Sequence, residues 1–521
     1  EDHDNQADHD PRVAQNASIG TVIRRSAAWI LAVALVPAGL LLGQSRPAIP
    51  AFWDAELLHD YELPLATPAM TPTHVSRDYY YALPERQLFK SYPIYHPDRE
   101  PAGYLDRLRA AEPEQVFDSA NLKTDADWIA AGRDIFEMPI DYGGPIVSLD
   151  DVRDRAWYAR HRMPLTKDGT MPFARYVVRE KGKVEVGNLA CSMCHTRVMP
   201  DGTAILGAQG NFPFDGVFAA QLPSLPPALV PIVFRTLVAA PWDAAGTARL
   251  QAMTPATFQA ALAGVPPGVL IRQGTSVFAP PAIPDLIGLR DRKYLDKTGL
   301  GRHRGLADVM RYAAMNQTLD VLGNYGGFVP AAPDGRTLAP PGKGEFNGAG
   351  DRYSDAQLFA LGQFIYSLTP PPNPNPRDAT AVRGEAVFTA SGCARCHTPP
   401  LYTANQLVPA PGFTPPADHL AKYDILTERV GTDPALTMTT RRGTGYYKIP
   451  SLKGVWYRGP FEHSGSVATL EDWFDPRRLR DDYVPTGFKG LAPTRAVPGH
   501  LFGLSLSADD RAALIAFLKT L

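Results

Sequence analysis

The sequence predicts a mainly α-helical fold in which two units of similar layout follow one another along the chain. The pattern Cys-x-x-Cys-His occurs twice, at residues 191–195 and 393–397. A second motif follows each pattern, Ile-Pro-Asp-Leu-Ile-Gly-Leu at 283–289 and Ile-Pro-Ser-Leu-Lys-Gly-Val at 449–455. Each unit then ends in an apolar stretch with helical periodicity. Repeats of this kind indicate a duplicated structural unit.

The helices that close the two units are expected at 354–368 and 507–521. Ser354 and Ser507 stand directly before them, and acidic residues follow in the first turn. A serine in this position accepts a hydrogen bond from a free backbone N–H group, so both are predicted N-caps.

The helices that open the two units are expected at 126–136 and 381–389, where short amphipathic segments occur. The second segment leads directly to Cys393. An insertion at 139–190 separates the first segment from Cys191. Each unit is therefore predicted as helix, Cys-x-x-Cys-His, Pro-rich loop and terminal helix.

The boundaries of the predicted parts follow from changes in composition. The chain has 51 prolines and 44 glycines in 521 residues, which favours long Pro-rich loops. Seven residues at 370–376 include five prolines and mark a stiff linker. The predicted parts are a disordered N-terminus at 1–17, a membrane anchor or signal segment at 18–43, an irregular N-terminal arm at 44–125, a first domain at 126–369, the linker at 370–377 and a second domain at 378–521.

The N-terminal segment carries the features of export. Arg24 and Arg25 precede an apolar run at 27–43, which is near the lower limit of length for a membrane span and is interrupted by Pro37. Arginines on this side of the run place the N-terminus inside the cell and the rest outside. An uncleaved anchor is favoured over a signal peptide cleaved after Ala38 and over a buried core helix.

Charge gives no indication of a nucleic-acid partner. The chain has 52 basic and 54 acidic residues, a net charge of -2, and no block rich in lysine or arginine. Proteins that bind nucleic acid carry clustered positive charge. We therefore expect small-molecule chemistry without nucleic acid.

The two Cys-x-x-Cys-His patterns account for all four cysteines of the chain. This spacing is typical of covalent haem c attachment, in which both thiols bond the haem and the adjacent histidine binds the iron. A zinc site is the alternative, but zinc ribbons place their Cys-x-x-Cys pairs much closer together. The predicted cofactors are two covalently bound haem c groups, and the fold class is two tandem cytochrome c-like haem domains. The predicted attachment residues are Cys191, Cys194, His195, Cys393, Cys396 and His397.

Haem attachment of this type takes place outside the bacterial inner membrane, which agrees with a periplasmic protein anchored to that membrane.

The segment 448–466, Lys-Ile-Pro-Ser-Leu-Lys-Gly-Val-Trp-Tyr-Arg-Gly-Pro-Phe-Glu-His-Ser-Gly-Ser, adds a family resemblance. It resembles the K-x-P-S/T-L-R-N-V…A-P-Y-F-H-D/S-G-S segment of the bacterial di-haem cytochrome c peroxidase superfamily, which includes MauG. The resemblance covers roughly residues 126–521. The long N-terminal arm and the separation of the haem motifs are similar to the rubber oxygenase branch.

The resemblance implies that the two haems have different roles. The haem at Cys191, Cys194 and His195 would react with a small-molecule oxidant, and the haem at the second motif would pass on electrons from a small periplasmic cytochrome c or cupredoxin. It also implies a Ca²⁺ ion between the domains, bound partly by the backbone carbonyls of Arg458 and Pro460.

The sixth ligand of the second haem is expected shortly before the terminal helix. The resemblance implies a methionine or a tyrosine there, but the sequence reads Pro-Gly-His-Leu-Phe-Gly at 498–503. His500 is therefore the predicted ligand, with a packed loop histidine as the alternative and Met438 as the next choice. His463, in the Phe-Glu-His-Ser-Gly segment, is expected to form hydrogen bonds beside the haem or to serve a structural role.

The predicted catalytic residues are Asn316, Gln317 and Tyr294. Asn316 and Gln317 follow a helical segment after Gly299, where the resemblance implies the distal pocket of the first haem. Amides hydrogen-bond but move protons poorly, which suits O2 better than peroxide cleavage. The resemblance implies an aromatic electron relay in the segment 293–296, where Tyr294 is the predicted residue, with Trp456 or Tyr457 as alternatives. Three functions remain open: a peroxidase-like oxidoreductase, which is favoured, an O2-dependent oxygenase of a hydrophobic substrate, and a non-catalytic electron-transfer or sensor protein.

Overall fold

The computed structural model describes residues 47–51, 58–68, 72–74, 77–142, 146–224, 244–271, 277–314, 328–330, 351–440 and 442–521. All of them belong to one compact body, which spans residues 46–521 and contains both repeated units. The segments expected to be a disordered N-terminus and a membrane anchor lie outside the described residues. Within these ranges, no helix has the length and apolar character needed to cross a membrane.

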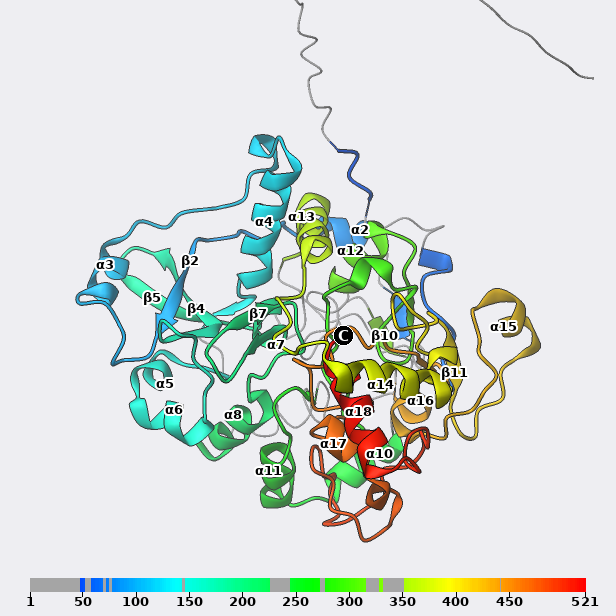
Figure 1. Ribbon diagram of the computed structural model, residues 1–521. Coiled ribbons are helices and arrows are strands. Elements are labelled where there is room, and N and C mark those ends of the chain that lie inside the picture. The colour runs from blue at the N-terminus through cyan, green and yellow to red at the C-terminus, as the bar shows by residue number, and fades with distance from the viewer. Residues whose placement is uncertain are drawn as a thin grey trace, which may run out of the picture. The chain divides into compact units, whose positions relative to one another are not determined.

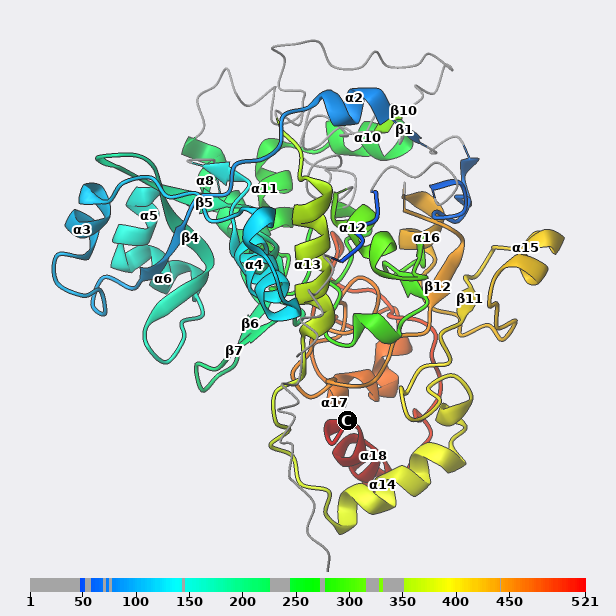
Figure 2. The ribbon, with the colours of Figure 1, turned by 90° about the horizontal axis from the view of Figure 1, so that it is seen from above.

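Two pairs of helices in close contact form the helical core of the repeat. Helix α4 (Asp125–Glu137) packs on α13 (Asp355–Ser367), and α14 (Ala379–Ala390) packs on α18 (Ala508–Lys519), as Figures 1 and 2 show. All four helices were expected from the sequence at these places and are confirmed.

The N-caps of the closing helices are also confirmed. The Ser354 side chain accepts a hydrogen bond from the backbone N–H of Gln357, and the Gln357 side-chain oxygen accepts one from the backbone N–H of Ser354. The Ser507 side chain accepts from the N–H of Asp510. Each cap satisfies backbone donors that the first turn of a helix leaves free.

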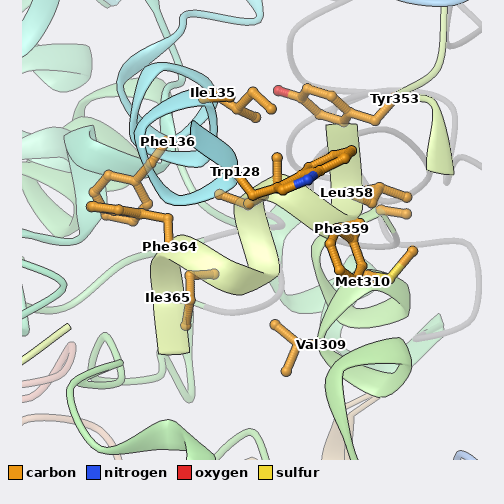
Figure 3. Packing of buried hydrophobic residues seen from close by; sticks show 14 of the residues in the cluster. Trp128, Ile135, Phe136, Val309, Met310, Tyr353, Leu358, Phe359, Phe364 and Ile365 are labelled. Carbon is orange, nitrogen blue, oxygen red and sulfur yellow. The ribbon is translucent and has the colours of Figure 1, made fainter. Parts of the chain in front are cut away.

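A glycine allows the first helix pair to approach closely. A Cβ atom on Gly132 would lie 1.9 Å from the carbonyl oxygen of Ala360, so only glycine fits. One turn further, the rings of Phe136 and Phe364 pack with their centres 5.1 Å apart (Figure 3). They belong to a large buried cluster that also receives residues of α12 (Leu306–Ala314) and contacts Cys191.

The second helix pair repeats this contact. A Cβ on Gly384 would lie 1.9 Å from the carbonyl oxygen of Ala513, and the rings of Phe388 and Phe517 lie 5.4 Å apart. Each glycine precedes its phenylalanine by one helical turn, as in the first pair. The two crossings therefore have the same geometry, as expected for a duplicated unit.

The internal repeat has the same backbone in both halves. Residues with positive φ occupy matching places, namely Gly288 and Gly454 (71° and 75°), Asp296 and Glu462 (64° and 74°), and Gly299 and Gly465 (69° and 70°). Positive φ is uncommon outside glycine. Its appearance at an acidic residue in both copies indicates that these two loops follow the same path.

A four-stranded antiparallel sheet corrects the expectation of a mainly α-helical fold. Its strand order is β2-β4-β5-β3, and the structure as a whole is mixed α/β. The strands are β2 (Ser91–Tyr95), β4 (Thr170–Glu180), β5 (Lys183–Asn188) and β3 (Asp141–Tyr142). Three of them lie at 139–190, where the sequence predicted only an insertion. The alternating burial of Met171, Phe173, Val184 and Val186 around the Lys181-Gly182 turn was the signal for a hairpin.

The N-terminal arm is not irregular throughout. It contains α2 (Arg77–Ala82), strand β2 and α3 (Tyr104–Ala110), and β2 pairs with β4 along one edge of the sheet. Because a strand of the arm completes a sheet of the insertion, these two parts of the chain fold together. Short helices α5 (Leu149–Arg153) and α6 (Arg155–His161) pack beside this sheet, as Figure 1 shows.

The remaining elements are short and connect these parts. The helices are α7 (Cys191–Cys194), α8 (Phe214–Gln221), α10 (Ala244–Gln251), α11 (Pro255–Ala263), α15 (Ala417–Lys422), α16 (Ala435–Thr439) and α17 (Leu470–Trp473). The strands form two-stranded antiparallel pairs: β1 (Pro72–His74) with β10 (Phe328–Pro330), β6 (Thr196–Val198) with β7 (Ala204–Leu206), β8 (Tyr294–Leu295) with β9 (Gly301–Arg302), and β11 (Leu407–Pro409) with β12 (Tyr446–Lys448).

Candidate haem sites

The second Cys-x-x-Cys-His motif lies at the wall of a large cavity. Cys393, Cys396, His397 and His500 all line this cavity, which has a volume of about 250 Å³. Cys393 begins a short 3-10 turn, Cys393–Arg395, that follows α14, and Cys396 is the C-cap of this turn. The structure therefore brings the predicted attachment residues together with the predicted sixth ligand, although about 100 residues separate them in sequence.

The His397 side chain is oriented for metal binding. Its Nδ1 lies 3.1 Å from the carbonyl oxygen of Pro450 and 3.3 Å from that of Tyr402. Carbonyl oxygens only accept, so Nδ1 carries the proton and Nε2 keeps its lone pair. Burial lowers the pKa of His397 to about 4, which keeps the ring neutral. A backbone carbonyl on the far nitrogen is the usual support of a metal-binding histidine.

His500 faces His397 across the cavity. The centres of the two imidazole rings lie 6.3 Å apart. With metal–nitrogen bonds of about 2.0 Å, two imidazoles on opposite sides of one metal ion place their ring centres roughly 6 Å apart. Burial, assisted by His397, lowers the pKa of His500 to about 3, so this ring is neutral as well. Its Nδ1 is buried and, among the described residues, has no hydrogen-bond partner. Two neutral imidazoles beside two thiols fit a covalently bound haem with two histidine ligands.

The backbone around His500 is held from both sides. His500 has a φ of 46°, its N–H donates to the carbonyl of Val430 (2.7 Å), and its carbonyl accepts from Arg478 Nη2 (2.8 Å). Arg478 also donates to the carbonyls of Val497 (2.7 Å) and Trp473 (2.9 Å) and is only 1 % exposed. A left-handed residue of this size persists only where the surroundings define it. Arg478 provides that definition, and no motif in the sequence pointed to it.

Met438, the other ligand considered, does not line this cavity. It lies on α16, where its backbone carbonyl accepts a hydrogen bond from the Thr67 hydroxyl (3.1 Å). The thioether is therefore not positioned to compete with His500.

His463 lies at the same cavity but is engaged by other groups. Its Nε2 lies 3.0 Å from the Thr432 hydroxyl, and its ring stacks on Tyr447 with ring centres 3.4 Å apart and planes at 4°. Burial lowers the pKa of His463 below its usual value. These contacts fit the expected hydrogen-bonding role beside the haem better than ligation.

Tyr294 reaches the cavity of the second motif from the first unit. Its hydroxyl donates to Asp424 Oδ2 (3.1 Å) and accepts from the Asp424 N–H (3.0 Å), and the residue is 4 % exposed. Burial raises the pKa of Tyr294 to about 12, so the phenol keeps its proton. The side chain thus lies where the two units meet.

The first motif occupies helix α7, and Cys191 packs against the cluster formed by α4, α12 and α13. The strand pair β6–β7 then folds back, and the N–H groups of Gly207 and Gly210 donate to the carbonyls of His195 (2.7 Å) and Cys194 (3.0 Å). Helix α12 ends at Ala314, and the predicted catalytic residues Asn316 and Gln317 lie outside the described residues. The structure does not form a disulfide at any of the four cysteines, all of which are described.

The interface expected to bind Ca²⁺ is joined by a glutamine. Gln209 Nε2 donates to the carbonyls of Pro460 (3.0 Å) and Gly268 (3.1 Å), and its Oε1 accepts from the Gly459 N–H (3.2 Å). In the part of the chain that the structure describes, no group of three or more His, Cys, Asp or Glu side chains is arranged for a metal ion. A haem iron needs only two protein ligands, so that finding concerns Ca²⁺, which stays a prediction.

No protein-family model matches the chain. An uncharacterized protein of Sinorhizobium fredii, y4iJ, is 32% identical over a region covering 19% of this chain and 22% of the relative. The chain therefore spans about a fifth of the length of the curated relative it matches. Similar solved structures include a MauG-like protein associated with microbial copper homeostasis (TM-score 0.21, 21% identity, 32% of this chain and 56% of that one). Another is the hydrazine synthase of Kuenenia stuttgartiensis (TM-score 0.25, 17% identity, 47% and 73%). Likenesses of this size carry no argument about function.

Proposed function

We propose that this protein is a periplasmic di-haem c-type oxidoreductase that reduces hydrogen peroxide at its first haem, with electrons relayed by its second. The observation that carries the proposal is the pair His397 and His500, which face each other at ligand separation beside Cys393 and Cys396. Neutral, oppositely placed imidazoles next to two thiols are the protein groups that a six-coordinate haem c requires.

The residues of the second site suit electron transfer and exclude an oxidant. A haem bound there supplies one-electron redox chemistry. His397 is oriented by the Pro450 carbonyl, and His500 is held in place by Arg478 and Val430. With His397 and His500 both holding the iron, a small oxidant would find no free position at this haem. The haem at the second motif is therefore the relay, with a lower potential than a histidine/methionine pair would give.

The reaction is assigned to the haem at Cys191, Cys194 and His195. Reduction of one H2O2 to two molecules of water consumes two electrons and two protons, and the two haems together can supply both electrons. Tyr294, which lies at the second cavity and belongs to the first unit, is the proposed relay residue between them. A small periplasmic cytochrome c or cupredoxin is the proposed donor, and the segment at 18–43 is the proposed inner-membrane anchor.

An O2-dependent oxygenase of a hydrophobic substrate is the second candidate function. The observation that favours it is the amide pair Asn316 and Gln317 after α12. Amide side chains stabilise a bound polar diatomic ligand through hydrogen bonds but do not move the proton that peroxide cleavage needs. The non-catalytic alternative requires a sixth protein ligand at both haems.

The purified di-haem protein distinguishes these functions by its spectra and turnover. We expect one low-spin haem with two histidine ligands, one haem that binds small exogenous ligands, and H2O2 consumption driven by a reduced small cytochrome. His500→Ala should convert the low-spin haem to high-spin, whereas Met438→Ala should leave it unchanged. Two low-spin haems that never bind an exogenous ligand would refute the catalytic proposals. A stable O2 adduct without peroxide turnover would favour the oxygenase.

A further inference from the structure

Four basic side chains converge on the cavity of the second motif, away from its histidines in sequence. They are Arg292, Lys297, Lys448 and Arg458. The first two come from the first unit and the other two from the second. Arg292 and Arg458 also occupy the same position in the internal repeat, nine residues after its isoleucine. Duplicated arginines that point into one cavity indicate a ligand with more than one anionic group.

The two arginines are anchored but not neutralised. Arg292 donates to the backbone carbonyls of Asp285 and Ile287, and Arg458 donates to the carbonyl of Ser451 (2.7 Å). Both guanidinium groups share the buried carboxylate of Asp285, at 3.8 Å and 3.9 Å. Within the described residues, Nε of Arg458 is buried without a hydrogen-bond partner.

The positive charges of the two lysines are offset still less by neighbouring groups. Lys448 Nζ has a backbone contact, the carbonyl of Tyr294 at 3.3 Å. Burial, together with the neighbouring guanidinium groups, lowers the pKa of Lys297 to about 8 and that of Lys448 well below its usual value. Both ammonium groups therefore stand in an environment that disfavours their charge until an anion enters it.

The charges around the cavity do not balance. Four basic groups and two carboxylates, those of Asp285 and Glu462, line it. A third carboxylate, that of Asp296, also acts on Lys297 and Lys448 but is bound by Arg442. Glu462 is in addition occupied by the N–H and hydroxyl groups of Ser464 (2.8 Å and 2.6 Å). When all are charged, the four basic groups exceed the two lining carboxylates by two. Buried charges without partners are strongly unfavourable, so a ligand with two negative charges would be bound firmly here.

We propose that Arg292, Lys297, Lys448 and Arg458 bind the two propionate carboxylates of the haem attached at Cys393 and Cys396. This inference rests on the proposed haem at the second motif and adds its orientation. The propionates would lie on the side of the cavity that Tyr294 lines, because Lys448 contacts the Tyr294 backbone and two of the four cations belong to the first unit. Residues of both units would thereby hold them.

Resonance Raman spectroscopy of the holoprotein tests the assignment, because the propionate bending band reports hydrogen bonds to these carboxylates. Lys448→Met and Lys297→Met should each shift the band of the low-spin haem to lower frequency, and the double variant should shift it further. Lys448→Arg should restore most of the shift. Lys453→Met is the matched control, since Lys453 is an exposed lysine of the same loop. The midpoint potential of the low-spin haem should fall in the Met variants, because a positive charge beside the ferric iron is removed.

The outcomes separate this inference from the proposed function. If the wild-type protein shows no low-spin haem with two histidine ligands, the proposed function fails. If that haem is present in wild type and variants but its propionate band stays unchanged in both single variants and in the double variant, the propionate assignment alone is overturned. The retained low-spin spectrum shows at the same time that the variants have folded.

Discussion

Arg478 donates a hydrogen bond from Nη2 to the backbone carbonyl of His500, with the two atoms 2.8 Å apart. The arginine reaches His500 from the 3-10 turn Pro476–Leu479 and is buried. Its guanidinium donates to three backbone carbonyls and lies over the Trp473 ring, 5.2 Å from the ring centre. Through these carbonyls it acts as a clamp on the loop geometry. The position of His500, the predicted sixth ligand, therefore depends on a residue that is not itself a predicted ligand.

Replacement of Arg478 should loosen this ligand. Arg478→Met removes the donor of three carbonyls; a buried acceptor left unpaired, as that of Val497 would be, costs about 1–3 kcal/mol, and the two partly buried ones cost less. We expect a lower free energy of unfolding and a mixture of low-spin and high-spin haem in the optical and EPR spectra. Arg477→Met is the control, because the Arg477 side chain is 80% exposed. An unchanged low-spin spectrum in a folded Arg478→Met protein would show that His500 does not need the clamp.

The close helix contacts at Gly132 and Gly384 predict large and similar losses of stability when either glycine is replaced. Alanine at Gly132 or Gly384 places a Cβ 1.9 Å from a helix carbonyl of the partner helix, which must move. Overpacking of this kind destabilises by about 1–3 kcal/mol or more. Chemical denaturation should show this loss for both variants. Gly216→Ala on α8 is the control, since a Cβ there meets nothing within 4 Å, and it should be neutral or slightly stabilising.

Asp215 predicts a dependence of stability on pH that is independent of haem. It is 3% exposed on α8, and burial raises its pKa to about 8 against the opposing hydrogen bond from the Ile271 N–H (3.0 Å). A raised pKa means that the folded state binds a proton that the unfolded state releases. This contribution is present below about pH 4 and is lost as the pH rises towards 8.

Asp215→Asn should remove this loss, because the amide stays neutral and its oxygen still accepts from Ile271. Relative to wild type, its free energy of unfolding should rise by roughly 3–5 kcal/mol between pH 4 and pH 8. Urea denaturation at a series of pH values measures the difference. Asp150→Asn, at an exposed position of α5, should show no such trend. A constant difference for Asp215→Asn would mean that the carboxyl is ionised in the folded protein.

Tyr294→Phe tests the relay role separately from packing. The variant loses both hydrogen bonds to Asp424, which should lower the free energy of unfolding by about 1–2 kcal/mol, and should leave both haem spectra unchanged. If the phenol carries electrons between the haems, peroxide turnover with a reduced small cytochrome should fall at least tenfold. Asp424→Asn keeps the phenol and serves as the control. Equal turnover in wild type and Tyr294→Phe would remove Tyr294 as a relay.

The local patterns of the sequence predicted the helical repeat well. Ser354 and Ser507, the apolar periodicity behind them and the repeated Ile-Pro motif depend on interactions within one turn or one loop. Such interactions can be predicted from the local sequence because they do not depend on the rest of the fold. The sheet was missed because β2 and β4 are more than 70 residues apart, and a strand is stabilised by a partner that local pattern does not reveal.

The chemistry available at each motif could be predicted from the sequence. Two thiols and an adjacent histidine at fixed spacing predict covalent haem attachment wherever the chain places them, and because 498–503 contain no methionine, His500 was the predicted ligand. How these groups meet could be seen only in the folded chain. The His397–His500 separation, the Arg478 clamp and the convergence of Arg292, Lys297, Lys448 and Arg458 join segments far apart in sequence. Their geometry depends on how the two units pack, because ligand distance, burial and charge balance are properties of three-dimensional contact and not of residue order.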